Sequence, residues 1–234
     1  MLKIGILSNS HAASLKVGWE SIKENYPNIE LTFFAAANKG MAKVKPESGN
    51  RFTSADILIT RMLSITSGGL GSIEVDDYDA FLVYGLFLIL PRLDHRHTRA
   101  VKEIAIKETV HSSLNYRFVR DLRDMTDVPI FYGANPLLAD NIFLQVSDAT
   151  EYHGYEEISA WMDNCYSGLN VNQMLQPEET RGNMLTTKRE YSDGSVRLKL
   201  LTDDVEQHKD TDVRHMNGSF GAAYLEKSLF PLVT

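Results

Sequence analysis

The sequence predicts a three-layer α/β fold with a doubly wound parallel sheet and a β-hairpin excursion near the C-terminus. Apolar runs of strand length recur along the chain, at Lys3–Leu7, Ile29–Ala36, Asp79–Tyr84 and Val128–Tyr132. The segment between the first two runs has the apolar spacing of a helix. Strands that alternate with helices are typical of a parallel sheet covered by helices on both faces. We expect a single domain over residues 1–234.

The first strand and the helix after it form the best-defined unit. Lys3–Leu7 runs into the polar cluster Ser8-Asn9-Ser10-His11, which is typical of a turn at the carboxyl end of a strand. The helix predicted over 12–26 has an apolar face made of Leu15, Trp19, Ile22 and Tyr26. Because only short turns join this helix to the strands on either side, we expect a right-handed parallel crossover.

The middle of the chain is less regular. Residues 41–56 are polar, and we expect a short strand at Ile57–Thr60 and a loop over the Ser/Gly-rich segment 64–72. The apolar spacing from Val101 to Leu122 predicts one broken helix or two helices. The spacing over Gly154–Leu175 predicts another helix.

The C-terminal part begins with a hairpin pattern. Leu185–Tyr191 and Ser195–Leu200 flank Ser192-Asp193-Gly194, which predicts a β-hairpin with a glycine turn outside the main sheet. After the polar segment Asp212–Gly221, the spacing predicts a terminal helix over Ser219–Leu229.

Composition excludes several classes of partner and location. The chain has 234 residues, 43% of them hydrophobic, and a net charge of -7 without a basic run, which argues against nucleic acid as a partner. Its longest apolar run, Ala80–Leu90, is about half the length of a membrane span, so we expect no membrane partner. Met1–Leu7 is too short for the core of a signal peptide, and the single cysteine, Cys165, agrees with a reducing compartment. We expect a cytoplasmic protein, and the sequence leaves its oligomeric state open.

The turn after the first strand is a candidate active site. Ligands of open α/β sheets bind at the carboxyl ends of the strands, where the next helix points its amide-rich N-terminus. A serine in this turn, Ser10, would be exposed, close to backbone donors and able to act as a nucleophile. The alternative is that Ser10 or Asn9 only caps the helix. His11 either lines a substrate pocket or simply occupies the first helical turn.

A second polar cluster stands near the C-terminus. The spacing of Asp212 and His215 puts a carboxylate and an imidazole on the same side of one turn. The carboxylate can accept from Nδ1–H and leave Nε2 free as a base, although a buried structural histidine would show the same pattern. The pairing with Ser10 favours the functional interpretation. We expect Asn217 to brace this loop through a bond to backbone.

These two clusters resemble the first and last blocks of the SGNH/GDSL hydrolases. Ser8-Asn9-Ser10-His11 resembles the first block, usually Gly-Asp-Ser, with Ser10 at the nucleophile. Asp212, His215 and Asn217, with Phe220-Gly221 where the family often has Tyr-Gly, resemble the last block. The resemblance covers the whole chain and implies a flavodoxin-like sheet, with the serine after its first strand and the Asp/His pair before the final helix.

The middle blocks match the family less well. The resemblance implies oxyanion donors from the serine amide, from a glycine after the second strand and from an asparagine after the third. Gly40 is the candidate glycine, with Asn38 equally near, and Gly85 aligns with the third block. Phe87 stands where the asparagine should be. Because one oxyanion donor is worth about 2.7–4 kcal/mol, we expect a substitute donor from Asn38 or Asn135, or else slow or lost catalysis.

The resemblance implies an esterase or acyltransferase that acts on a small O-acyl ester, such as a carbohydrate ester, through an acyl-enzyme and without a cofactor. Two alternatives stay open. One is a non-catalytic member of the same fold that binds a carbohydrate or a protein, and Phe87 is its main support. The other is a flavodoxin-like binder of a nucleotide or anion at the first turn, which gives His215 no role.

Other polar patterns are weaker. Asp94-His95-Arg96-His97 has the look of a metal site but no further ligands at suitable spacing, so we expect a solvated helix start and no metal. His111, His153 and His208 are isolated in the sequence, which favours surface or capping positions. The glycines of 67–71 lack the lysine of a phosphate loop and are expected in a mobile loop. Cys165 is expected to serve packing.

Overall fold

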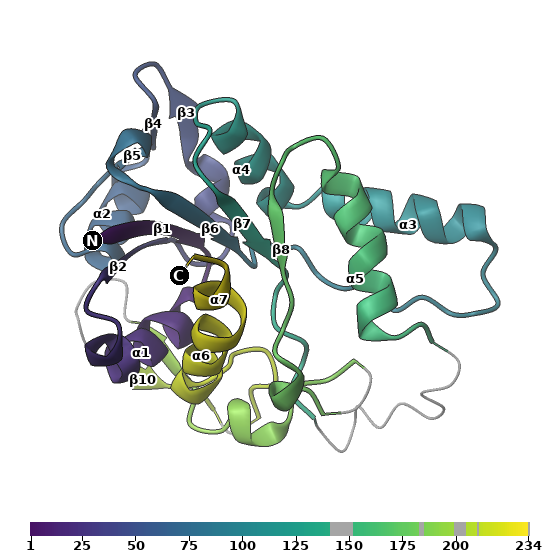
Figure 1. Cartoon of the computed structure of the whole chain (residues 1–234). Coiled ribbons are helices and arrows are strands. Elements are labelled where there is room, and N and C mark those ends of the chain that lie inside the picture. The colour runs from purple at the N-terminus through teal and green to yellow at the C-terminus, as the bar shows by residue number, and fades with distance from the viewer. Residues whose placement is uncertain (141–151, 183–184, 199–204, 210, 234) are drawn as a thin grey trace.

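The computed structural model describes residues 1–140, 152–182, 185–198, 205–209 and 211–233. At its centre is a five-stranded sheet in which all neighbouring strands are parallel (Figure 1). Its strands are β1 (Leu2–Ser8), β2 (Ile29–Ala35), β6 (Ala80–Tyr84), β7 (Ile130–Gly133) and β8 (Asn172–Met174). Their order in space is β2-β1-β6-β7-β8, the doubly wound, flavodoxin-like order.

Helices cover both faces of this sheet, which confirms the predicted three-layer α/β fold. One face carries α1 (Ala12–Ile22), α6 (Gly218–Tyr224) and α7 (Phe230–Val233), with a π-helical turn at Leu225–Leu229 between the last two. The other face carries α2 (Ile57–Ser67), α3 (Arg99–His111), α4 (Leu114–Arg123) and α5 (Tyr155–Asp163). Short 3-10 turns lie at Lys23–Asn25, Gly40–Lys43, Val75–Asp77, Asn164–Tyr166, Glu178–Thr180 and Arg189–Tyr191.

Strand β1 lies inside the sheet, between β2 and β6, and is buried on both faces because helices cover the sheet on both sides. Ile4 and Ile6 belong to the core beneath α1 and α6, whereas Leu7 belongs to the core beneath the other helices. Alternate residues of a strand point to opposite faces, so a continuous apolar run is what a doubly covered strand requires. The polar residues that follow β1 therefore lie at the carboxyl end of the parallel strands, which is where ligands of such folds bind.

One predicted strand is a helix instead. Ile57–Thr60 is the first turn of α2, where the Asp56 side chain accepts from the Leu58 amide and caps the helix. Gly68, with φ of 83°, ends it, so the predicted loop over 64–72 begins only there. The capping bond and the burial of Ile59 and Leu63 outweigh the strand preference of the β-branched residues.

The region predicted to be irregular contains a second sheet. Within 41–56, strand β3 (Lys45–Glu47) pairs with β4 (Arg51–Thr53), which also pairs with β5 (Ile73–Glu74). All pairs in this small sheet are antiparallel. The helix predicted over Gly154–Leu175 is also too long, because the chain leaves α5 and turns into β8. Positive φ at Gly168 and Asn170, 87° and 50°, makes that turn.

A hairpin is present near the C-terminus, but its strands differ from the prediction. Strand β9 (Val196–Leu198) pairs antiparallel with β10 (Val205–Gln207). The predicted first strand, Leu185–Tyr191, instead ends in a 3-10 turn, and within it only Thr187 makes isolated bridges among the described residues. Residues 199–200 of the predicted second strand lie outside the described residues. The terminal helical segment begins at Gly218, close to the prediction.

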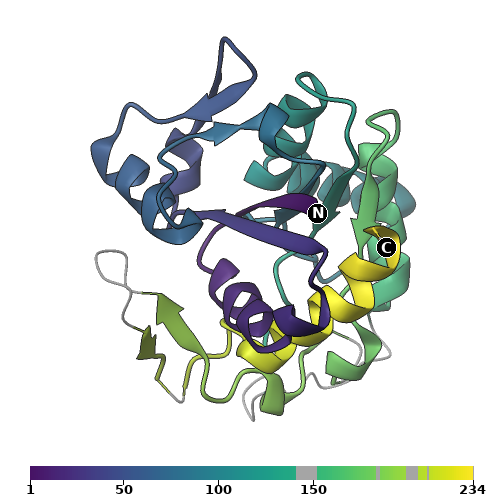
Figure 2. The same cartoon turned by 60° about the vertical axis from the view of Figure 1, so that its left-hand side comes forward.

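Helices α1 and α6 lie side by side although almost the whole chain separates them (Figures 1 and 2). Three glycines allow this contact, Gly18 on α1 and Gly218 and Gly221 on α6. A Cβ on Gly221 would collide with the backbone of Ser14, and one on Gly18 would collide with the backbone of α6. The close crossing brings the N-terminus of α6 to the N-terminus of α1, where Ser10 lies. Within the described residues, no helix is both long and apolar enough to cross a membrane.

Candidate functional site

Ser10 lies in the turn between β1 and α1. The last residue of β1, Ser8, pairs with Tyr84 of β6 and is buried, whereas Ser10 is exposed. The carbonyls of Asn9 and Ser10 accept from the amides of Ala12 and Ala13, which starts the helix. The serine side chain is therefore not used as a helix cap in this structure, and it is free to face the C-terminal cluster.

Ser10, His215 and Asp212 form a continuous chain of hydrogen bonds. The distance from Ser10 Oγ to His215 Nε2 is 3.1 Å, and the distance from His215 Nδ1 to Asp212 Oδ2 is 2.9 Å. A carboxylate can only accept, so Nδ1 of a neutral His215 carries the proton and Nε2 accepts from the serine hydroxyl. This is the tautomer in which an imidazole can act as a general base toward a serine.

Asp212 is held as a carboxylate by donors from several sides. Its Oδ1 accepts from the amides of Arg214 and His215, at 2.7 and 3.0 Å, and its Oδ2 accepts from the His215 ring. Burial by itself raises the pKa of this carboxyl, but these bonds outweigh burial and lower the pKa to about 2. The group is therefore ionised at any pH at which the protein would work, and it can stabilise a protonated His215.

The loop that carries this pair is braced by Asn217, as predicted. The Asn217 side chain accepts from the Phe220 amide at 3.1 Å, which caps α6. Its amide group also donates to the carbonyls of Glu190 and Asp193, at 2.7 and 2.9 Å. One side chain thus ties the N-terminus of α6 to the turn before the hairpin.

His11 is buried beside the Ser10–His215 pair. Its ring centroid lies 5.4 Å from that of His215, and its Nδ1 is among the buried polar atoms without a hydrogen-bond partner. Burial, and then the neighbouring imidazole of His215, lower the pKa of His11 to about 3. His11 is therefore a neutral side chain in the wall of the site.

His208 was missed as a site residue by sequence reasoning, which expected a surface or capping position. Its Nδ1 lies 3.2 Å from Asp212 Oδ2, the oxygen that also accepts from His215. The rings of His208 and His215 are stacked, with centroids 4.1 Å apart and an interplanar angle of 7°. Its spacing of four residues before Asp212 was the only sequence signal for this contact.

The amides of the two candidate glycines, Gly40 as the implied oxyanion donor and Gly85 in the third block, are already hydrogen-bonded. The Gly40 amide donates to the Ala37 carbonyl at 2.9 Å, and the Gly85 amide donates to the Gly133 carbonyl at 2.9 Å. Neither amide can bind an oxyanion without breaking its bond, so the Gly40 amide is not free in this structure to act as the donor that the resemblance implies. The Ser10 amide, by contrast, has no acceptor among the described residues.

Gly85 nevertheless lies in the wall of the site, beside Asn135 and His11. A Cβ on Gly85 would lie 2.9 Å from Asn135 Oδ1 and 3.5 Å from His11 Cδ2. Asn135 follows β7, and its Oδ1 is buried without a hydrogen-bond partner. The structure therefore brings Asn135 to the site wall. Asn38 is exposed in the turn after β2, with φ of 54°.

The backbone around Phe87 is unusual. Gly85, Leu86 and Phe87 have consecutive positive φ values of 71°, 53° and 66°. A left-handed conformation costs a non-glycine residue roughly 1–2 kcal/mol, so this turn needs support from its surroundings. The support comes from Asn115, whose backbone amide donates to Leu86 O and whose side chain donates to Val83 O. Phe87, at the position where the resemblance implies an asparagine, supplies no polar side chain there.

The metal-like cluster at 94–97 is not assembled as a metal site. The Asp94 carboxylate accepts hydrogen bonds from the Arg96 guanidinium, with 2.9 Å between Nε and Oδ2, and from the Arg96 backbone amide, with 2.7 Å between N and Oδ1. The ring of His95 lies against that of His153, with centroids 4.1 Å apart and the planes tilted by 54°. His153 is buried and bonded to Glu157 at 2.7 Å rather than placed on the surface. His111 packs against Tyr116.

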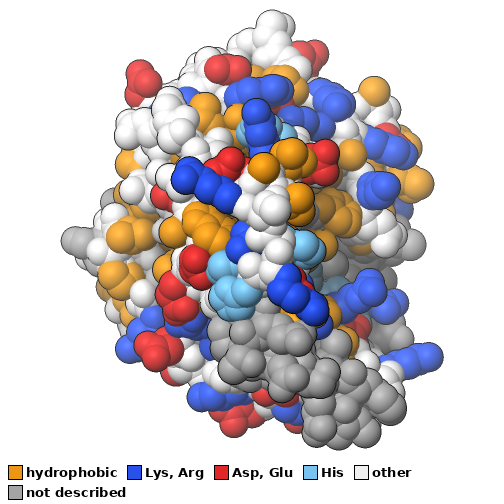
Figure 3. Space-filling model, turned by 90° about the vertical axis from the view of Figure 1, so that its right-hand side faces the viewer, with side chains coloured by type: hydrophobic (Ala, Val, Ile, Leu, Met, Phe, Trp, Pro, Cys, Tyr) orange, Lys and Arg blue, Asp and Glu red, His pale blue; other side chains and the backbone are white. Residues whose placement is uncertain are grey.

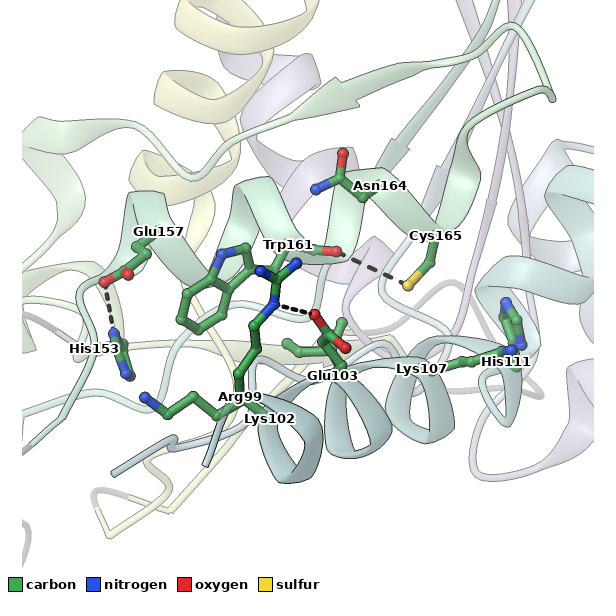
Figure 4. Close-up of a pocket in the computed structure, with 11 residues that line it drawn as sticks. Arg99, Lys102, Glu103, Lys107, His111, His153, Glu157, Trp161, Asn164 and Cys165 are labelled. Atoms are coloured by element: carbon green, nitrogen blue, oxygen red, sulfur yellow. Dashed lines mark hydrogen bonds and ion pairs between the residues drawn. The ribbon is translucent and has the colours of Figure 1, made fainter. Parts of the chain in front are cut away.

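A cavity of about 810 Å³ lies elsewhere, between α3 and α5 (Figures 3 and 4). Its walls include the Arg99–Glu103 ion pair and Lys107 from α3, and Trp161 and Cys165 across from them (Figure 4). No residue of the Ser10–His215–Asp212 chain lines it. Burial raises the pKa of the Cys165 thiol, so this cysteine is not activated as a nucleophile.

Comparison with known proteins leaves the function open. No protein-family profile matches the chain, and no curated protein matches its sequence. A gut microbial diltiazem-metabolizing enzyme is 11% identical over 73% of this chain, with a TM-score of 0.36, and this chain spans 36% of its length. A DUF4886 family protein from Bacteroides uniformis is 9% identical, with 95% and 79% of the two chains covered and a TM-score of 0.40.

Proposed function

We propose that this protein is a serine hydrolase or acyltransferase of the SGNH type that acts on a small O-acyl ester. The observation that carries the proposal is the hydrogen-bonded chain from Ser10 through His215 to Asp212, at 3.1 and 2.9 Å. A nucleophile, a base and a group that orients the base are the three parts required for covalent acyl transfer. The exposure of Ser10 gives a substrate access to the hydroxyl.

The proposed reaction has two steps. In the first, Ser10 Oγ attacks the ester carbonyl while His215 Nε2 takes its proton, and His215 then gives that proton to the leaving alcohol. In the second, His215 takes a proton from water, which attacks the acyl-serine; His215 then gives that proton to Ser10 Oγ as the acid is released. A sugar hydroxyl in place of that water would make the protein an acyltransferase. Asp212 holds the imidazole in place and stabilises its charged form.

The developing oxyanion needs donors, and this site offers fewer than the family does. We assign the Ser10 amide as the first donor, because it has no acceptor among the described residues. We assign the Asn135 side chain as the second, because it reaches the wall of the site beside Gly85. Its buried Oδ1 lacks a partner, and a rotated amide would present Nδ2 there instead.

A second function is favoured by one observation. The Gly40 amide is bonded to a carbonyl, and Phe87 stands where the resemblance implies an asparagine, so two of the three usual oxyanion donors are not available in the described site. A protein with the same fold that binds a carbohydrate or a protein partner would need none of them. Such a binder would have no use for an activated serine.

The deciding experiment is intact-protein mass spectrometry after incubation with a fluorophosphonate probe. We expect one adduct on the wild type and none on Ser10→Ala or His215→Ala. Ser219→Ala is the matched control, since Ser219 is an exposed serine on the neighbouring helix α6 and should leave labelling unchanged. The absence of any adduct on the folded wild type would exclude the hydrolase and favour the binding protein.

A further inference from the structure

Three side chains around the candidate site form a second arrangement that serine catalysis does not require. His208 follows β10, and Asp212 and His215 precede α6. One ligand atom from each of the three lies within 4.8 Å of the others. Their side chains are 5%, 20% and 21% exposed, so the cluster lies just below the surface.

These are the ligand types that zinc prefers. Two imidazole nitrogens and one carboxylate oxygen, with a water molecule as the fourth ligand, complete a tetrahedral zinc site. Zinc–nitrogen and zinc–oxygen bonds of about 2.0–2.2 Å place neighbouring ligand atoms roughly 3.3–3.5 Å apart. The Nδ1 atoms of His208 and His215 lie 3.2 and 2.9 Å from Asp212 Oδ2, so these two separations need to grow by only a few tenths of an ångström. The two rings are stacked at 7°, so an ion also requires them to rotate out of parallel until both Nδ1 lone pairs point toward it.

We propose that His208, Asp212 and His215 bind a zinc ion and that this ion switches off the serine site. The inhibition rests on the proposed function, whereas the binding does not. A zinc ion on Nδ1 of a neutral His215 displaces the proton of that nitrogen to Nε2. Nε2 then donates to Ser10 Oγ and has no lone pair with which to take the serine proton. The Nε2–H to Ser10 bond becomes the outer-shell contact that a zinc-bound histidine usually makes.

The geometry also separates this inhibition from zinc catalysis. The ion and Ser10 contact different nitrogens of the same ring, so they lie on opposite sides of His215. A substrate carbonyl held against Ser10 Oγ is therefore beyond the reach of the ion. A zinc ion in this site leaves His215 unable to accept the serine proton and takes Asp212 as a ligand. The ion also lies too far from the substrate carbonyl to polarise it in place of the lost base.

Binding is tested first by isothermal titration of metal-free wild-type protein with zinc chloride. We expect one site, and we expect its loss in His208→Phe and His208→Gln. The phenylalanine variant keeps a flat ring against His215 and removes only the nitrogen, while the glutamine variant keeps polarity. His97→Gln removes an exposed histidine from another part of the surface and should bind zinc like the wild type.

Inhibition is tested by the rate of fluorophosphonate labelling with and without zinc, expressed as a ratio for each variant, so that changes in the basal rate cancel. We expect zinc to suppress labelling of the wild type and of His97→Gln but not of the two His208 variants. Failure of the wild type to bind zinc would overturn the proposal, as would equal suppression in the His208 variants. If metal-free wild type is not labelled at all, the hydrolase proposal fails, and the titration still decides the zinc site.

Discussion

At the scale of single residues, His215 has a partner on each ring nitrogen, Ser10 on one side and Asp212 on the other. Hydrogen bonding on both sides fixes the ring plane and the tautomer at once. The side chain that decides the tautomer is Asp212, because it can only accept.

The first prediction follows from that role of Asp212. An amide in Asp212→Asn can rotate to donate to Nδ1, which favours the tautomer with the proton on Nε2. We expect the labelling rate to fall roughly 10²–10⁴-fold while the fold is kept. The measurement is the second-order rate constant for the fluorophosphonate probe, with circular dichroism as the check on folding. An unchanged rate would show that Asp212 does not orient the base.

The second prediction concerns His11 and pH. Its pKa is lowered to about 3 by burial and then by His215, and His208 acts in the same direction, while Asp212 opposes them. The unfolded chain binds a proton near pH 6.5, whereas the folded one does not until about pH 3, so stability falls as the pH drops through this range. Going from pH 7 to pH 5 should cost about 2 kcal/mol.

Urea unfolding at the two pH values, in metal-free buffer, measures this cost. His11→Gln carries no such proton, so its free energy of unfolding should lose about 2 kcal/mol less between pH 7 and pH 5 than that of the wild type. His97→Gln, in which an exposed histidine is replaced, should behave like the wild type. Equal pH dependence in all three proteins would show that His11 titrates normally in the folded state.

At the scale of elements, the N-terminus of α6 sets the position of the Asp212–His215 loop. Asn217 caps the helix and bonds to two carbonyls of the turn before the hairpin. The cap uses Oδ1 of Asn217, whereas the tether, by which we mean the two bonds to Glu190 O and Asp193 O, uses Nδ2. The two interactions can therefore be separated by mutation.

The third prediction uses this separation. Asn217→Ala removes the cap and the tether and should cost about 1–2 kcal/mol of stability, with slower labelling of Ser10. Asn217→Asp keeps an acceptor for the Phe220 amide and loses the donors to Glu190 and Asp193. It should recover most of the stability and little of the labelling rate. Chemical denaturation and probe kinetics on both variants distinguish the two effects, and identical behaviour of the variants would contradict the tether.

The fourth prediction concerns the contact between α1 and α6. A methyl group on Gly221 would meet the backbone of Ser14, so Gly221→Ala must push the two helices apart. We expect a loss of about 1–3 kcal/mol and a strong loss of labelling, because Ser10 and His215 sit at the adjoining helix ends. Ser219→Ala, on the exposed side of α6, should change neither quantity. A Gly221→Ala protein with full stability would show that the crossing tolerates a side chain.

At the scale of the whole molecule, the sequence predicted the features that depend on local pattern. A buried strand needs a run of apolar residues, so the central strands were found at Lys3–Leu7, Ile29–Ala36 and Asp79–Tyr84 nearly at their observed bounds. The spacing of Asp212 and His215 needs only one turn of chain. Their pairing with Ser10 was predicted with the help of the family resemblance, and in the structure His215 lies within hydrogen-bond distance of both Ser10 and Asp212.

The rest could not be found from local pattern, because it depends on contacts made elsewhere in the fold. Ile57–Thr60 has strand-like residues, and only the cap at Asp56 and burial against the sheet make it a helix. The amides of Gly40 and Gly85 are unavailable because of the carbonyls that face them, which residue identity does not encode. His208 reaches Asp212 because the end of the hairpin, at β10, packs beside the site.

The bond between Ser10 and His215 joins residues 205 positions apart in the chain. A ribosome that adds about 5–20 residues per second completes the second partner roughly 10–40 s after the first. Throughout that interval the serine is an ordinary hydroxyl, because its base has not yet been made. On the proposed function, the nascent chain therefore cannot attack esters around it, and the reactivity of Ser10 would first arise when the last helix docks.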